Sequence, residues 1–89
     1  METIEICGVK FPKNAVMISY KSIDYPQKWD FLNEAIIEFE DIDSKNQRVY
    51  FSYTNTLGEK SSCWFYFNEL FGEVELISLE RYKKIRVFT

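Results

Sequence analysis

The chain has 89 residues, a net charge of −3 and aromatic side chains at 18% of its positions. This length predicts a single domain over residues 1–89, and the apolar and charged fractions exclude a disordered chain and a membrane-spanning run. The sequence contains no histidine, which excludes the commonest general base and the commonest metal ligand, so we expect no enzyme, no cofactor and no metal site.

The first residues predict three strands. Residues 3–7 alternate between apolar and polar side chains and predict a strand that ends at Gly8. Residues 9–11 are expected to return beside it, and residues 15–20 predict the next strand. The beginning of the chain lacks the basic and apolar regions of a signal peptide, which favours a cytoplasmic protein whose two cysteines are reduced core thiols.

Residues 23–43 have two interpretations. An apolar stripe at helical spacing favours a helix at about 25–40. Consecutive β-branched residues and a polar turn before Arg48 instead favour a helical turn at 26–33 followed by a strand at 35–42. We prefer the second interpretation, because the acidic residues at the end of a long helix would face the negative end of its dipole.

Residues 48–54 and 61–67 are two aromatic and β-branched runs around a short polar loop, and they predict a β-hairpin. A three-residue loop that ends at a left-handed Gly58 sets the register, with Tyr50 opposite Trp64. One face of this hairpin then carries the core candidates, which are Val49, Phe51, Tyr53, Cys63, Phe65 and Phe67.

The last part of the chain predicts a helical turn and two strands. Residues 68–72 are expected to form the helical turn, residues 73–79 a strand, residues 80–83 a turn and residues 84–88 a final short strand.

Together these elements predict a mainly β fold, an antiparallel meander of five to six strands that forms a small SH3-like barrel with one short helix or helical turn. The alternative is an α+β fold in which a helix at about 25–40 packs on an antiparallel sheet. The final strand also predicts a homodimer, because an exposed edge strand pairs readily with a second copy.

The reverse face of the hairpin carries the first candidate site. Tyr50, Trp64 and Tyr66 should lie beside one another there, and such aromatic clusters are typical of binding hot spots. The competing interpretation is that the segment around residues 29–32 folds over this face and buries it.

Charged residues form two further candidate sites. The acidic segment that contains Glu38, Glu40, Asp41 and Asp43 is either a surface for a basic protein partner or an ordinary solvated face. The basic end indicates nucleic-acid contact or a charged edge strand, and its residues are Arg81, Tyr82, Lys83, Lys84 and Arg86.

These features favour a non-catalytic protein-interaction module in the bacterial cytoplasm that acts on a protein partner as a small inhibitor or adaptor. Its size and composition suggest a phage or mobile-element origin. The alternative is a small nucleic-acid-binding barrel that uses the basic C-terminal end.

Overall fold

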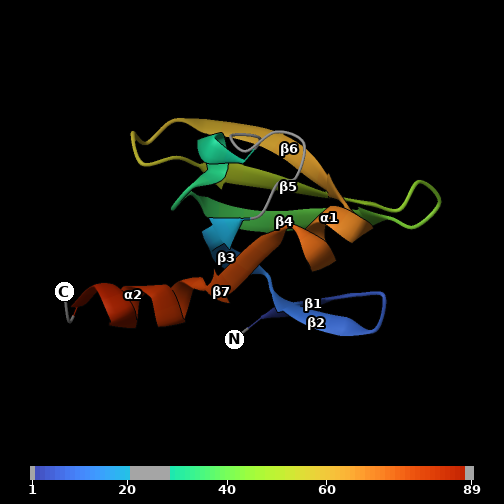
Figure 1. Cartoon of the computed structure of the whole chain (residues 1–89), viewed down its shortest axis with the longest axis horizontal. Helices are drawn as coiled ribbons and strands as arrows, with labels where there is room; N and C mark the ends of the chain where they lie inside the picture. Colours follow the sequence, from blue (N-terminus) through green and yellow to red (C-terminus); the bar gives the residue numbers. More distant parts are fainter. Residues whose placement is uncertain (1, 21–28, 88–89) are drawn as a thin grey trace.

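A computed structural model describes residues 2–20 and 29–87 of the chain (Figure 1). Its strands are β1 (Thr3–Ile6), β2 (Val9–Pro12), β3 (Asn14–Tyr20), β4 (Ile36–Asp43), β5 (Arg48–Thr54), β6 (Lys60–Tyr66) and β7 (Val74–Ser78). Its helical elements are the 3₁₀ turn η1 (Asp30–Leu32) and the short helices α1 (Phe67–Gly72) and α2 (Leu79–Val87). The prediction of a mainly β, antiparallel fold is confirmed.

The strands form two antiparallel sheets. Strands β1 and β2 make a separate hairpin, and the larger sheet has the strand order β6-β5-β4-β3-β7. Strands β3 to β6 follow one another as a meander, and β7 returns to the far edge to pair with β3. Within the described residues β6 pairs only with β5, so the sheet has two open edges.

The prediction of an SH3-like barrel is therefore wrong, because the sheet does not close on itself. Helix α1 connects β6 to β7 and contacts both edge strands. Its Leu70 side chain is only 3% exposed and belongs to the hydrophobic core. Because a helix and its core side chain lie across this gap, the backbones of β6 and β7 cannot approach to the roughly 4.8 Å that strand pairing needs.

The segment before β5 is a strand, as the preferred interpretation predicted. Residues 36–43 pair with β5, and residues 36–38 also pair with β3 on the other side, so a helix at about 25–40 is wrong. Of the predicted helical turn, residues 30–32 form η1, and residues 26–28 lie outside the described residues. Pairing on both sides lets the β-branched residues of β4 pack on a sheet, which satisfies their strand preference.

The hydrophobic core lies on one face of the larger sheet. The rings of Phe51 and Phe65 stack with their centroids 4.6 Å apart, and both side chains are fully buried. Trp29 lies 5.0 Å from Phe65 at an edge-to-face angle, and Phe31 lies 5.6 Å from Tyr53. The segment around residues 29–32 therefore covers the core face of the hairpin and not its reverse face.

The C-terminal residues differ from the prediction. Residues 79–87 form α2 in place of a turn at 80–83 and a strand from residue 84, and residue 88 lies outside the described residues. The Ser78 hydroxyl accepts a hydrogen bond of 3.1 Å from the Arg81 backbone N–H, which is the contact of a helix N-cap. This cap and a run of good helix formers outweigh the apolar alternation at the end of the chain.

Both cysteines are free thiols. Cys63 is half-buried and packs against the core, as predicted. Cys7 is exposed in the β1–β2 turn, where its φ of 52° belongs to a tight turn. The prediction of a core thiol is therefore wrong for Cys7, because the strand ends one residue before it.

Candidate interaction surface

The face of the larger sheet opposite to Phe51 and Phe65 carries the candidate site, and we call it the outer face. The strand register places its side chains in rows across β4, β5 and β6. One row is Asp41, Tyr50 and Trp64, and the next row is Asp43, Arg48 and Tyr66. The hairpin register agrees with the prediction, including Tyr50 opposite Trp64.

A β-bulge in β4 brings Asp41 and Asp43 to the outer face. Phe39 pairs with Phe51 and Asp41 pairs with Tyr50, so Glu40 is an extra residue between the two pairs. Strict alternation from the buried Phe39 would direct Asp41 into the core. The bulge reverses this phase, so that Asp41 is exposed and Ile42 packs against the core.

The aromatic residues of the outer face contact one another and a cation. The Trp64 and Tyr66 rings meet edge to face, with centroids 4.7 Å apart. The guanidinium carbon of Arg48 lies 5.2 Å from the Trp64 ring centroid and 5.6 Å from that of Tyr50. Both distances fall within the range of cation–π attraction, so this pair of rings already accommodates one guanidinium group.

Asp43 holds Arg48 in this position. A carboxylate oxygen of Asp43 lies 3.5 Å from Nη2 of Arg48. Asp43 also accepts hydrogen bonds from the side chain and the backbone N–H of Asn46, at 2.8 Å and 3.1 Å. These Asn46 bonds, with a smaller effect of Arg48, lower the pKa of Asp43 below its ordinary value of 3.8. The carboxylate is therefore charged near neutral pH and can pair with Arg48.

An open depression of about 430 Å³ lies on the outer face beside this pair of rings. It is lined by Glu40 and Asp41 of β4, by Tyr50 of β5, and by Ser62 and Trp64 of β6, with Phe51 and Cys63 also contributing. Arg48 lies in the neighbouring row with Tyr66, whereas Ser62 of the depression lies in the row on the opposite side, so Arg48 contacts the Tyr50–Trp64 pair from the other side. The depression thus has an aromatic wall and an acidic wall.

The structure brings together two candidate sites that the sequence placed apart. All seven predicted partner-binding residues lie on the outer face, four from β4 and three from the β5–β6 hairpin. Tyr66 is 43% exposed, Tyr50 and Trp64 are half-buried, and Glu38, Glu40 and Asp41 are exposed. Sequence reasoning missed Arg48, although its even spacing from Tyr50 places it on the same face.

The basic residues of the C-terminal end lie elsewhere. Arg81, Lys83 and Lys84 are exposed on α2, and Arg86 belongs to the same helix. The Tyr82 hydroxyl donates a hydrogen bond of 2.8 Å to Glu34, which ties that ring to the body of the domain. Helix α2 contacts β3 and β7, so Arg81, Lys83 and Lys84 lie away from the aromatic cluster of β5 and β6.

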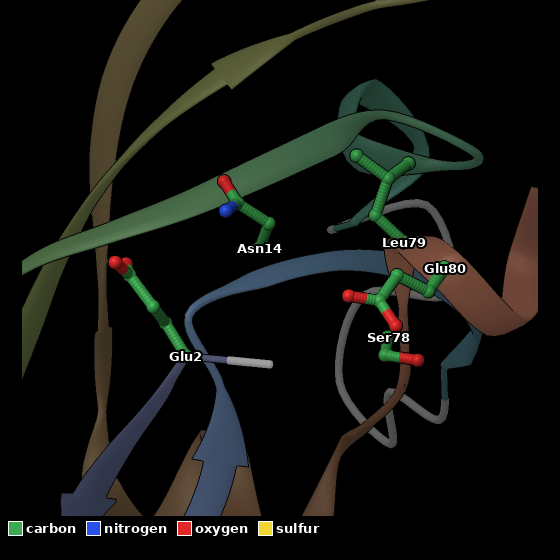
Figure 2. Close-up of a pocket in the computed structure, with 5 residues that line it drawn as sticks. All are labelled: Glu2, Asn14, Ser78, Leu79 and Glu80. Atoms are coloured by element: carbon green, nitrogen blue, oxygen red, sulfur yellow. The ribbon is translucent and has the colours of Figure 1, made fainter.

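A second depression, of about 260 Å³, lies where α2 begins (Figure 2). It is lined by Glu2, Asn14, Ser78, Leu79 and Glu80. In Figure 2 the Glu2 carboxylate points away from Ser78, Leu79 and Glu80. The Ser78 hydroxyl caps α2, and none of the five lining residues is basic.

Comparison of the chain with protein-family models, with curated proteins and with solved structures found no match. The described helices include none with the length and apolar character needed to cross a bilayer. The described residues also contain no cluster of three or more cysteine, aspartate or glutamate side chains placed to hold a metal ion.

Proposed function

We propose that this protein is a non-catalytic interaction module that binds a protein partner through the outer face of its sheet. The observation that carries this proposal is the position of Tyr50, Trp64 and Tyr66 beside four acidic residues on a face that the segment around residues 29–32 leaves uncovered. Binding hot spots are enriched in tryptophan, tyrosine and arginine side chains, and polar and charged residues lie at the rim around them.

The role that fits such a module is that of a small inhibitor or adaptor. A domain of this size presents one face to a partner, and the acidic residues of β4 favour a partner with a basic surface. The further suggestion of a phage or mobile-element origin and a cytoplasmic location rests on size and composition only.

Affinity capture tests this proposal with two bait variants. Wild-type protein should retain a stoichiometric protein partner from a bacterial lysate, and Trp64→Ala should lose it. Glu5→Gln, a change on the separate β1–β2 hairpin, should retain the partner. Capture of no stoichiometric partner under several conditions contradicts the proposal.

The stability of tryptophan variants provides an independent check. Trp64→Ala removes a half-buried ring with one edge-to-face and one cation–π contact, so it should lower the free energy of unfolding by only about 1 kcal/mol. Trp29→Ala empties a core position that is 4% exposed and should cost about 3–5 kcal/mol. Urea unfolding measures both values. A loss of about 3 kcal/mol or more in Trp64→Ala would mean that this ring is a core residue and not a binding surface.

The second candidate function is nucleic-acid binding by α2. It is favoured by the exposure of Arg81, Lys83 and Lys84 on one helix near the end of the chain. Phosphate contacts of this kind weaken steeply with salt. An electrophoretic shift at low salt that disappears with added salt supports this function, and no complex at low salt removes it.

A further inference from the structure

We infer that the depression between Glu40, Asp41 and Trp64 is a binding site for an arginine side chain of the partner. This inference rests on the proposed function and gives the chemistry of the contact. The two walls of the depression differ in kind, since one presents carboxylates and the other presents the rings of Tyr50 and Trp64. A ligand that satisfies both walls must carry a positive charge and have a face that stacks on a ring.

The charge of the acidic wall is free to pair with a ligand. Glu40 and Asp41 are exposed, and within the described part of the chain neither carboxylate forms an ion pair. One oxygen of Asp41 accepts a hydrogen bond of 2.9 Å from the Ile42 backbone N–H in the bulge. This bond orients the Asp41 side chain, while the nearby carboxylate of Glu40 supplies a second charged acceptor.

The aromatic wall already accommodates the same chemical group on its other side. Arg48 places its guanidinium 5.2 Å and 5.6 Å from the centroids of Trp64 and Tyr50, and Asp43 supplies the paired carboxylate. The depression repeats these parts, with Glu40 and Asp41 in the role of Asp43. A partner arginine would therefore make with the outer face the same type of contact that Arg48 makes within the chain.

The arrangement favours arginine over lysine. A guanidinium group is planar, so it can stack on an indole or phenol ring while its N–H groups donate to two carboxylate oxygens. An ammonium group is a more strongly hydrated point charge and gains less from stacking. An open depression of this kind suits a side chain presented by an exposed segment of the partner.

Nuclear magnetic resonance with defined peptides tests the inference. The probes are three capped pentapeptides with four glycines and a central arginine, lysine or citrulline. The two tryptophans act as internal reporters, because Trp64 lines the depression and Trp29 is buried in the core. We expect the arginine peptide to shift the Trp64 indole N–H signal in a saturable way and to leave the Trp29 signal in place.

The other two peptides should bind less well. The lysine peptide should bind about tenfold more weakly, because it loses the stacked and bidentate geometry. The citrulline peptide has nearly the same shape without the charge and should give no saturable shift. Equal affinity for arginine and lysine, equal shifts with citrulline, or no response of Trp64 to arginine would overturn the inference.

Matched charge variants locate the site. Glu40→Gln should weaken binding of the arginine peptide about tenfold, since it removes a charged acceptor from the depression. Glu5→Gln makes the same substitution on β1, outside the larger sheet, and should change the affinity less than about twofold under physiological salt. If both variants weaken binding equally, the peptide is attracted by overall charge and the assignment is wrong.

These outcomes separate the inference from the proposed function. If wild-type protein captures a partner through Trp64 but does not prefer the arginine peptide, the arginine site is wrong and the interaction module stands. If the arginine peptide binds but no partner is captured, the site stands and the proposed function fails.

Discussion

Glu40 determines which side chains of β4 reach the outer face. As the extra residue of the bulge, it shifts the alternation so that Asp41 and Asp43 point away from the core and Ile42 packs against it. Without this residue the two aspartates would occupy core positions, where an unpaired carboxylate is costly. One inserted position thus makes an acidic surface and a continuous apolar core compatible within one strand.

The two tryptophans show how position decides the role of a residue type. Trp29 precedes η1, packs against Phe65 and places its indole N–H 3.4 Å from a Glu73 carboxylate oxygen. Trp64 projects from the opposite face of the same sheet and contacts Tyr66 and Arg48. The first ring stabilises the core, whereas the second belongs to the candidate site on the outer face.

Asp43 should make the free energy of unfolding depend on pH. Its folded pKa is lowered, chiefly by the Asn46 side chain, so its stabilising effect is fully present above the unfolded pKa of 3.8. This effect is lost as the pH falls below 3.8 through the lower folded pKa. Urea unfolding between pH 6 and pH 2 should therefore show that acidification lowers the free energy of unfolding less in Asp43→Asn than in wild-type protein.

The cause of this shift is testable by removing the donor. Asn46→Ala deletes the side-chain hydrogen bond to Asp43 and should raise the pKa of that carboxyl toward 3.8. A carboxyl titration followed by nuclear magnetic resonance measures the change. A wild-type pKa at or above 3.8, or no response to Asn46→Ala, would contradict the prediction.

The β5–β6 hairpin is the element that aligns the aromatic cluster. Its loop is closed by a hydrogen bond of 2.9 Å from the Asn55 N–H to the Glu59 carbonyl. The side-chain oxygen of Asn55 also accepts hydrogen bonds from the backbone N–H groups of Leu57 and Glu59. Gly58 has a φ of 83°, the left-handed conformation that the loop requires. Because the loop sets the register, it also sets which rings share the outer face.

Two glycine variants test this dependence. Gly58→Ala forces a side chain into the left-handed region and should lower the free energy of unfolding by about 1–2 kcal/mol. Gly72→Ala is the matched control, because Gly72 ends α1 in open space and lacks a positive φ. That variant should be neutral or stabilise the fold by up to about 1 kcal/mol. Equal losses in thermal or urea unfolding would contradict the assigned role of the loop.

The whole sheet is a curved layer whose two edges are bridged by α1. Buried side chains gather on the face that η1 and α1 cover, while the outer face over β4 to β6 presents the candidate site. The open edges have different surroundings, since β7 contacts both α1 and α2 and β6 contacts α1. The face under η1 and α1 therefore forms the core, and the outer face over β4 to β6 carries the candidate site.

The homodimer remains a prediction, but the residues expected to form it must change. Residues 84–87 belong to α2, so they cannot supply the pairing strand, and β6 is the edge with fewer neighbours. Light scattering at tens of micromolar should give about twice the single-chain mass of 10.7 kDa. Hydrogen exchange should then show protection of β6 amides that falls on dilution. A single-chain mass at every concentration would contradict the homodimer.

The sequence by itself determined the local features of this protein. Short-range patterns predicted the β1–β2 strands, the β4 strand, the β5–β6 register and the α1 turn, because alternation and turn chemistry act over a few residues. The same patterns placed Tyr50, Trp64 and Tyr66 on one hairpin face. They failed at α2, where apolar alternation over a few residues resembled a strand and the Ser78 cap went unrecognised.

Only the tertiary structure decided how these elements combine. The bulge at Glu40, the open sheet and the position of Trp29 on the core face depend on contacts between residues far apart in the chain. Local patterns do not encode such contacts, because a strand can pair or a loop can cover either face without a change in its own sequence. The acidic residues of β4 therefore lie beside the aromatic cluster and Arg48 because of the folded sheet and not because of any one segment.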